Sequence, residues 1–393
     1  MGGSPAEHAI DAALRHGNAI VKFITPNEVG ATGGHQYGYL LPKPIWKMFT
    51  DMPPTKGGNT KETVRVRWHG AGDTESSITW YGDKTRSEYR LTRFGKGFPF
   101  LEEDLVGDVL VLVRTSLREF EAFVVAGDEE TDQLLAALDI EIGRSWGAYT
   151  GGAAALTSAE RIKGCLGRRF ESFASRFNDF PDTTDFSREA VDSLRQCDPA
   201  ALKADADDCL MSLVRTEYEL FRHVERKLCS SMIEKGFGTV DAFLKTASSI
   251  MNRRKSRAGR SLENHVSWVL NQCSIPHAVR PQIAGRPDIV IPDAKSYENH
   301  REPGRPLWIL GVKSTCKDRW RQVLQEAPGV KTRHLLTVQP SISSSQIADM
   351  RKHEVTLVVP REIRKSYARS DQAQVLTLED FVSAVRQELP AKN

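Results

Sequence analysis

The stretch Leu307-Trp-Ile-Leu-Gly-Val-Lys313 is a short apolar run that ends in a lysine, a pattern typical of a buried β-strand. A second apolar run, Asp288-Ile-Val-Ile291, begins with an acid that follows Pro287. As neighbouring strands, the two runs would project Asp288 and Lys313 from one edge of a sheet. The sequence therefore predicts a sheet edge that carries an acid and a lysine.

The segments around these two runs alternate between helix and strand. Short β-rich runs recur at 334–338 and 355–359, and helical spacing of apolar residues occurs at 262–270 and 320–327. This order predicts an α/β domain with a mixed central sheet.

The first half of the chain is predicted to form mostly strands. Thr63-Val-Arg-Val-Arg-Trp68 alternates with a period of two residues, and 108–113 and 120–125 have the composition of a buried antiparallel pair. Turns that contain glycine separate these runs. We therefore expect a small β-barrel with a few helices.

A length of 393 residues suits two domains. Composition changes from about Gly151, so we predict an N-terminal domain over 1–175, a linker over 176–199 and a C-terminal domain over 200–393. The chain from about residue 195 onward is expected to fold alone. Helical spacing beyond the linker is carried by Val240, Phe243, Leu244, Ala247, Ile250 and Met251.

Bulk properties exclude several classes of protein. The 54 basic and 51 acidic residues give a net charge of +3, so total charge does not by itself indicate nucleic-acid binding. No apolar run approaches the ~18–20 residues of a membrane span, and Met1-Gly-Gly-Ser-Pro5 lacks a signal-peptide pattern, so a cytoplasmic protein is expected. The six cysteines have neither Cys-x-x-Cys nor zinc-ligand spacing, which predicts separate reduced thiols.

Two further acids can join Asp288 and Lys313. Glu326 lies on the helix after Lys313, in line with Arg319 and Gln322, and Glu263 flanks the apolar stripe of the upstream helix. Mg²⁺ prefers carboxylate oxygens as ligands, and a lysine can position water and stabilise a phosphodiester transition state. These residue types together predict a DNA-cutting site.

Two observations leave alternatives open. A Pro-Asp pair with a distant lysine occurs by chance in many chains, and helical Lys and Glu are usually solvated. The common nuclease pattern also has an acid two residues before the lysine, where this chain has Gly311. A DNA-binding regulator with a degenerate nuclease domain therefore stays open, as does a repair or structure-specific nuclease.

A dense basic run leads into Glu263. Arginine can bind guanine bidentately in the major groove, and lysine and arginine also bind phosphate, so this run predicts DNA contact. The alternative is a solvated, charged helix end. The run consists of Arg253, Arg254, Lys255, Arg257 and Arg260, separated by small residues.

A second basic segment lies in the N-terminal half. Lys84, Arg86, Glu88 and Arg90 alternate along Lys84–Arg93 and would line one face of a strand, where they can read DNA bases or form a ladder of ion pairs. The turn at Gly33-Gly34-His35 lacks the Gly-Lys-Ser/Thr ending of a phosphate-binding loop, which argues against ATP use.

At these residues the chain resembles the EcoRII-type restriction endonucleases, and the resemblance covers nearly its whole length in the same order. The segment from Gly311 to Ala327 is the most specific match. The other matching segments are Asn252-Arg-Arg-Lys-Ser-Arg-Ala-Gly259, Lys235-Gly-Phe-Gly238, Gly30-Ala-Thr-Gly-Gly-His-Gln36 and Lys84–Arg93.

The resemblance implies a dimeric Type IIE enzyme that cleaves double-stranded DNA at CCWGG (W = A or T) with Mg²⁺. It implies a C-terminal PD-(D/E)xK fold and expulsion of the central base pair from the duplex, with guanine contacts in the region 255–257. A cognate cytosine-5 DNA methyltransferase is expected in the same system. The implied catalytic residues are Asp288, Lys313, Glu326, Glu263, Tyr297 and Arg319, with Asp288, Glu326 and Glu263 as metal ligands.

For the N-terminal half, the resemblance implies a B3-like β-barrel that binds a second copy of the site as an allosteric effector and inhibits the nuclease. Leu40 replaces a family tyrosine, with Tyr37 and Tyr39 close by, and Tyr89 replaces a lysine. The implied DNA-binding residues are His35, Tyr39, Lys84, Arg86, Glu88, Arg90 and Arg215.

Overall fold

The structure is a computed structural model that describes residues 3–31, 37–83, 86–151, 164–299, 306–327, 330 and 333–389. Contacts divide the chain into two compact units. The first contains 1–154 together with 339–348 and 365–372, and the second contains the remainder. Within the described residues, no helix has the length and apolar character that a bilayer crossing requires.

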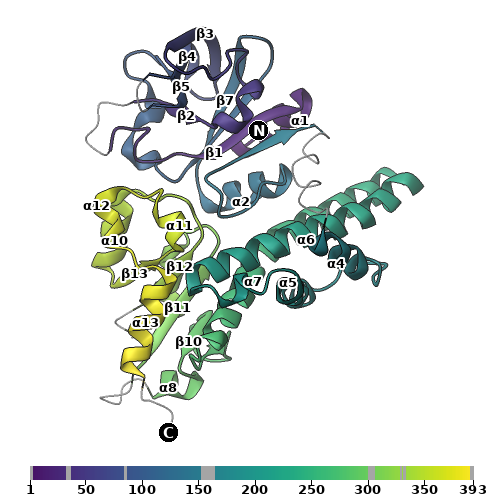
Figure 1. Cartoon of the computed structure of the whole chain (residues 1–393), viewed down its shortest axis with the longest axis vertical. Coiled ribbons are helices and arrows are strands. Elements are labelled where there is room, and N and C mark those ends of the chain that lie inside the picture. Colours follow the sequence, from purple (N-terminus) through teal and green to yellow (C-terminus); the bar gives the residue numbers. More distant parts are fainter. Residues whose placement is uncertain are drawn as a thin grey trace. The chain divides into compact units, whose positions relative to one another are not determined.

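The first unit is built on an eight-stranded sheet with the order β2-β5-β4-β3-β7-β6-β1-β8 (Figure 1). Neighbouring strands pair antiparallel except β3 and β7, which pair parallel. The predicted pair at 108–113 and 120–125 is confirmed as β6 and β7. The strands are β1 (Asn18–Phe23), β2 (Tyr39–Leu41), β3 (Asn59–Trp68), β4 (Gly72–Tyr81), β5 (Glu88–Thr92), β6 (Val109–Arg114), β7 (Glu119–Val125) and β8 (Trp146–Thr150).

Both faces of this sheet are covered near β1, β6 and β7. Alternate residues of β6 face opposite sides, so Leu110 and Leu112 join one apolar core while Val111 joins the other. The first core holds the aromatic side chains of β3 to β5. Helices α1 (Pro5–His16) and α2 (Asp128–Ala137) cover the second core. Burial on both faces explains why β6 is apolar throughout.

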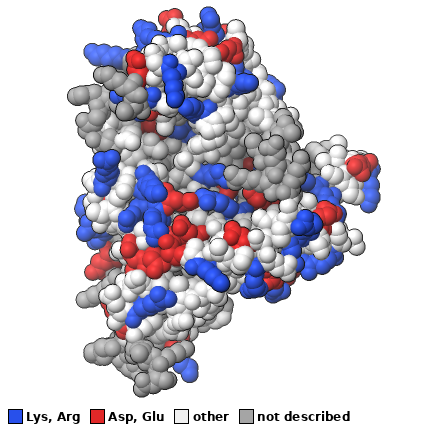
Figure 2. Space-filling model, in the orientation of Figure 1, with Lys and Arg blue, Asp and Glu red and all other residues white. Residues whose placement is uncertain are grey.

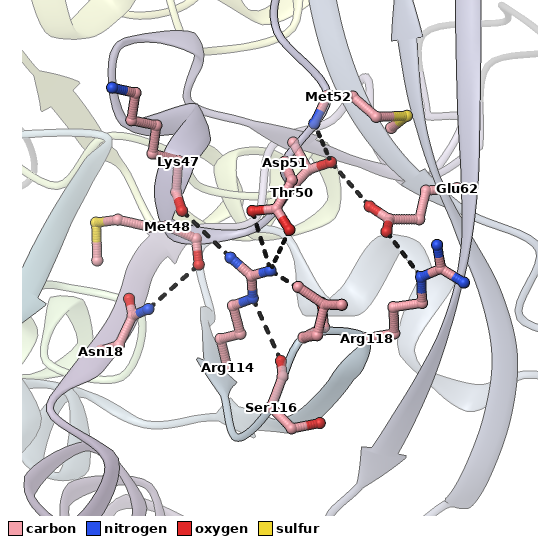
Figure 3. A network of polar contacts seen from close by, with 11 residues as sticks. Asn18, Lys47, Met48, Thr50, Asp51, Met52, Glu62, Arg114, Ser116 and Arg118 are labelled. Atoms are coloured by element: carbon pink, nitrogen blue, oxygen red, sulfur yellow. Dashed lines mark hydrogen bonds and ion pairs between the residues drawn. The ribbon is translucent and has the colours of Figure 1, made fainter.

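A polar network fastens the short helix η1 (Lys43–Met48) to the end of β6 (Figure 3). The Arg114 guanidinium donates to the carbonyl oxygens of Lys47 at 3.3 Å and Leu117 at 2.9 Å. It also lies 3.4 Å from the Asp51 carboxylate. One arginine thereby satisfies backbone carbonyls of η1 and of the turn between β6 and β7.

The second unit contains a five-stranded mixed sheet with the order β13-β12-β11-β10-β9. Strands β11, β12 and β13 are parallel, whereas β9, β10 and β11 pair antiparallel. The predicted α/β order is confirmed in this part. The strands are β9 (Ala278–Val279), β10 (Ile289–Ile291), β11 (Trp308–Lys313), β12 (Arg333–Thr337) and β13 (Val355–Val358).

Short helices follow these strands along the chain. They include α8 (Ala294–Glu298) after β10 and α9 (Trp320–Glu326) between β11 and β12. The others are α10 (Ser344–Lys352), α11 (Arg361–Arg364), α12 (Arg369–Gln372) and α13 (Leu378–Glu388). Contacts assign α12 and the first part of α10 to the first unit.

Two long helices, α6 (Ala206–Lys235) and α7 (Val240–Gln272), lie side by side with α4 (Cys165–Ala174) and α5 (Thr183–Cys197) against them (Figure 1). Phe170, Phe173, Phe186 and Phe221 share one apolar core. The range 176–199, predicted as a linker, thus contains α5 and packs within the second unit. The first-unit boundary lies at 154 rather than after 175.

A disulfide joins Cys165 at the start of α4 to Cys197 at the end of α5, with the two Cα atoms 5.6 Å apart. The prediction of six separate thiols is wrong for this pair. The helix hairpin brings together two residues that are 32 positions apart in sequence. Spacing rules that look for nearby cysteines do not detect such a pair.

The helical prediction over 240–251 is confirmed, but its apolar residues do not form a buried stripe. Val240 is 73% exposed, Phe243 50% and Leu244 53%. Ile233 and Phe237, at the turn from α6 to α7, are also exposed. These five exposed apolar side chains lie at the end of the helix pair where α6 leads into α7, with the rings of Phe237 and Phe243 5.4 Å apart, and they are called the tip patch.

Candidate active site

Asp288 and Lys313 meet at the end of the β10–β11 pair. Ile289 lies opposite Leu310, and the same register places residue 288 opposite residue 311, next to Val312 and Lys313. Asp288 Oδ2 accepts hydrogen bonds from Lys313 Nζ and from the Val312 N–H, each at 2.8 Å. The strands that the sequence predicted as neighbours are therefore paired.

Glu326, the last residue of α9, reaches the same lysine. Lys313 Nζ donates to Glu326 Oε1 at 2.9 Å, so the ammonium bridges two carboxylates. The second oxygen of Glu326 is buried and accepts no hydrogen bond from the described residues. It is therefore an oxygen that a bound cation could take as a ligand.

Gly311 explains why the position two residues before the lysine carries no acid. A Cβ atom at this position would lie 2.6 Å from Val323 Cγ2 on α9, far inside van der Waals contact. The missing side chain lets α9 pack directly on β11. Because Glu326 lies one helical turn beyond Val323, this close packing brings its carboxylate to Lys313.

Glu263 enters the site from α7. Its side chain is 7% exposed, and Oε1 accepts a hydrogen bond from Arg280 Nη2 at 2.5 Å. Arg280 follows β9, and its backbone N–H donates to the Asp288 carbonyl at 2.7 Å. The sequence analysis missed Arg280, because only the fold brings β9 beside α7.

Burial and charge shift the pKa values of these groups. Loss of water on burial raises the pKa of the Glu263 and Glu326 carboxyls, although nearby cations oppose the shift. Burial alone would lower the pKa of Lys313, but Asp288 and Glu326 outweigh it and raise this pKa. Lys313 is therefore an ammonium at neutral pH.

The acidic residues at the site are of the type that binds a hard divalent cation. Asp288, Glu263 and Glu326 offer carboxylate oxygens, which Mg²⁺ prefers, and one buried oxygen has no partner among the described residues. Yet no group of three or more His, Cys, Asp or Glu side chains in this part of the chain is arranged as a preformed metal cage. The cations of Lys313 and Arg280 lie on these carboxylates instead.

Tyr297 and Arg319 lie close in sequence to the site elements. Tyr297 on α8 is buried with Val290 and Ala327, and burial raises the pKa of its phenol. Arg319, at the start of α9, donates to Thr315 Oγ1 at 3.2 Å. A catalytic role for either side chain stays a prediction.

The basic run lies on α7, but its members differ in exposure. Arg254 is held by Glu225 of α6 at 2.8 and 2.7 Å. Arg257 is 8% exposed, lies 3.5 Å from Glu217 and covers the ring of Phe221. Arg260 is exposed, whereas Arg253 and Lys255 are partly exposed, and Arg253 lies 3.9 Å from Asp179. A DNA contact by any of these side chains stays a prediction.

The predicted effector residues of the first unit are only partly described, because His35 and Lys84 lie outside the described residues. Arg86 is exposed and covers the ring of Tyr81. Glu88 accepts from Arg90 Nε at 2.9 Å, and Arg90 is 8% exposed.

Tyr39 was predicted as a DNA contact, but its side chain is buried and its hydroxyl donates to the Phe100 carbonyl. It offers no surface to DNA in this conformation. Tyr37, two residues earlier, is 58% exposed. Tyr37 lies before strand β2, and Gly38 between the two tyrosines has a φ of 127°, so the strand geometry that buries Tyr39 does not extend to Tyr37.

Arg215 of α6, another predicted DNA contact, pairs with Glu362 of α11. Figure 2 shows basic and acidic side chains interspersed on the face in view rather than separated into one basic surface. This mixture agrees with the small net charge of the chain.

Glu217 is a second residue that sequence analysis missed. It is fully buried on α6, accepts from Ser187 of α5 at 2.7 Å and lies 2.7 Å from His265 Nε2 of α7. Burial alone would raise its pKa, but His265 and Arg257 outweigh burial and lower it. A glutamate within an apolar helix gives no sequence signal for such a role.

Comparison with known proteins follows the same division of the chain. The family model "EcoRII C terminal" matches residues 221–382, and "Restriction endonuclease EcoRII, N-terminal" matches 15–143. The Type II restriction enzyme EcoRII of Escherichia coli is 32% identical over 397 aligned positions, which cover 95% of each chain.

Solved structures of restriction enzymes bound to DNA are also similar. Metal-depleted Ecl18kI with uncleaved, modified DNA is 18% identical with a TM-score of 0.45, covering 57% of this chain and 84% of that one. The PspGI–substrate DNA complex is 16% identical with a TM-score of 0.45, covering 53% and 93%. With both family models and a full-length relative in agreement, this chain belongs to the EcoRII family of Type II restriction enzymes.

Proposed function

We propose that this site-specific deoxyribonuclease cleaves double-stranded DNA at CCWGG in a Mg²⁺-dependent reaction. The observation that supports it most is the Lys313 ammonium held between Asp288 and Glu326 at a strand edge. We assign the C-terminal part to the PD-(D/E)xK fold and the N-terminal part to a B3-like fold. Family membership supports both assignments.

The metal would be held by Asp288 and Glu326, with Glu263 as a third ligand. When bound, Mg²⁺ would neutralise charge on the non-bridging oxygens of the scissile phosphate. Asp288 and Glu263 are buried and Glu326 is partly buried, which strengthens the electrostatic effect of their charges.

Lys313 acts through its charge. Asp288 and Glu326 raise its pKa, so the side chain carries a positive charge in the site as described. It orients the attacking water by donating a hydrogen bond and stabilises charge that develops on the phosphoryl group. In-line attack on phosphorus then breaks the bond to the 3′ oxygen, which leaves 5′-phosphate and 3′-hydroxyl ends.

DNA would be held by Arg253, Lys255 and Arg260 of α7, with Arg86 contacting the effector copy in the first unit. We also propose that two copies of the chain associate through the tip patch. Its exposed Phe and Leu side chains are of the type that subunit interfaces bury. Sedimentation should give a dimer for the wild type and a monomer for Phe243→Asp/Leu244→Asp.

The first unit would bind a second CCWGG copy and restrain the nuclease until that copy is bound. A host methyltransferase that protects the same site, and a cytoplasmic location, complete the proposal. These parts rest on the family relation.

The test is digestion of phage DNA that carries many CCWGG sites, with and without Mg²⁺, followed by sequencing of the ends. Mg²⁺-dependent fragments that end at CCWGG are expected. Lys313→Ala should abolish cleavage and retain DNA binding in a shift assay. Lys352→Ala, which removes an exposed lysine of α10, is the matched control and should cut normally.

Two outcomes would defeat the proposal. Wild-type cleavage by Lys313→Ala would remove the assigned site. Tight, specific binding of CCWGG without any cutting would instead favour a DNA-binding regulator.

A further inference from the structure

Arg280 is fixed to the active site through its backbone. Its N–H donates to the Asp288 carbonyl at 2.7 Å, which extends the β9–β10 pairing by one hydrogen bond. Its φ is +44°, a left-handed conformation that residues other than glycine adopt rarely. Sheet pairing therefore holds this residue beside Asp288 despite an unfavourable backbone angle.

The side chains of Arg280 and Glu263 differ in freedom. Glu263 is 7% exposed, whereas Arg280 is 47% exposed. The Glu263 carboxylate is enclosed by protein, so bulk water cannot replace Arg280 as its hydrogen-bond partner. The guanidinium can leave toward solvent with its charge fully hydrated, so it is the half of the ion pair that can be exchanged.

The charge of the site also matters. Three carboxyl side chains (Asp288, Glu263, Glu326) face two cationic side chains (Lys313, Arg280), so the acids outnumber the cations by one. Lys313 contacts two of the carboxylates, and Arg280 takes the third. The described structure thus has a cation from the chain itself on every proposed metal ligand.

We propose that Arg280 is an internal counter-ion of Glu263 and that a divalent cation has to displace it to gain this carboxylate. Arg280 is then a positioning residue that holds the Glu263 carboxylate in place before metal arrives, and that weakens metal binding by competition. This inference rests on the proposed metal-dependent function and concerns how its site is loaded.

The inference predicts the direction of a measurable change. Removing the guanidinium removes both a competitor for Glu263 and a nearby positive charge. Divalent cations should therefore bind more tightly, by roughly five- to tenfold. An arginine that merely organised the ligand would give the opposite sign, because its loss would weaken the binding.

The experiment titrates the full chain without DNA with Mn²⁺, and follows free Mn²⁺ by electron paramagnetic resonance. Arg280→Gln should lower the Mn²⁺ dissociation constant roughly five- to tenfold, and Arg280→Lys should stay near wild type. Arg195→Gln is the matched control, because Arg195 also pairs with a single carboxylate, Asp192 of α5. It should leave the affinity unchanged.

Unchanged or weaker binding by Arg280→Gln would overturn the inference. Asp288→Asn separates this failure from failure of the proposed function. If Asp288→Asn loses Mn²⁺ but Arg280→Gln binds like wild type, the counter-ion role alone is wrong. If wild type and Asp288→Asn bind Mn²⁺ equally, the metal site itself is wrong and both proposals fall.

Discussion

Gly311 shows how one absent side chain can relocate a ligand. The fold leaves no room for a Cβ atom there, because Val323 of α9 lies against the strand. Under the proposed function, the carboxylate that other nucleases place two residues before the lysine would be supplied by Glu326, from the helix that packs on the glycine. The glycine at position 311 and the position of α9 are thus two aspects of one packing arrangement.

Gly311→Ala is expected to push α9 outward and destabilise the fold by roughly 1–3 kcal/mol, the usual range for overpacking a core. It should also lower Mg²⁺-dependent cleavage, because Glu326 moves with α9. The check is a double-mutant cycle with Val323→Ala, in which the double variant should be more stable than the sum of the two single changes predicts. If the stability changes of the two single variants simply add in the double variant, the contact between residues 311 and 323 is not the cause of the destabilisation.

His334 is a buried titratable residue outside the site. It is stacked on Trp308 and meets Phe381 edge to face, and burial lowers its pKa to about 4. Since the unfolded chain takes up this proton first, near pH 6.5, stability falls as pH drops from 6.5 toward 4, by about 3 kcal/mol in all. Urea unfolding at several pH values should show this loss in the wild type.

His334→Phe should remove that pH dependence while keeping an aromatic ring in the stack. His353→Phe alters an exposed histidine and serves as the control. A slope that is the same in wild type and His334→Phe would mean that another group causes the acid instability.

The helices α5, α6 and α7 are joined by one buried carboxylate. Glu217→Ala should destabilise the chain by about 3–5 kcal/mol, because it leaves Arg257 and His265 buried without their partner. Glu234→Ala removes an exposed acid from the same helix and should change stability by less than about 0.5 kcal/mol. Chemical unfolding measures both, and equal small losses would show that the network is solvated.

At the scale of secondary-structure elements, the sequence predicted where helices and strands lie better than which of them contact one another. The strands at 288–291 and 307–313 could be recognised because burial on both faces requires apolar residues throughout. The single helix α7 was seen as two separate helical segments, 240–251 and 262–270, because its exposed first part and buried last part carry unrelated apolar patterns.

Contacts between distant segments left no trace in the sequence. The pairs Arg280–Glu263 and Glu217–His265 and the Cys165–Cys197 bond each join elements that meet only after folding. Asp288, Lys313, Glu326 and Glu263 could be proposed together because the chemistry of phosphodiester cleavage restricts which residue types can serve. Arg280 has no such restriction, since any cation of suitable reach could pair with Glu263.

For the whole molecule, the structure changes where a catalytic fragment should begin. The sequence predicted independent folding from about residue 195, but α4 and α5 share a core with α6. A fragment of 195–393 would expose Phe221 and deprive Glu217 of Ser187. A fragment of 164–393 keeps these contacts and should be the more stable of the two.

Thermal unfolding of both fragments tests that expectation. On DNA with a single CCWGG site, 164–393 should also cut faster than the full chain, if the first unit restrains the nuclease as proposed. A well-folded 164–393 fragment with no gain on single-site DNA would refute the restraint, and equal stability of the fragments would refute the packing argument.

Helix α7 has 33 residues and is about 50 Å long, and it carries both the basic run and Glu263. Arg260 and Glu263 are less than one turn apart on this stiff rod. If DNA binds the basic run as proposed, a shift of the duplex along or across the helix would move Glu263 by nearly the same distance. A DNA sequence that fits the basic run poorly would then displace the Glu263 carboxylate from the reacting phosphate. The enzyme would therefore discriminate between DNA sequences in the cleavage step as well as in binding.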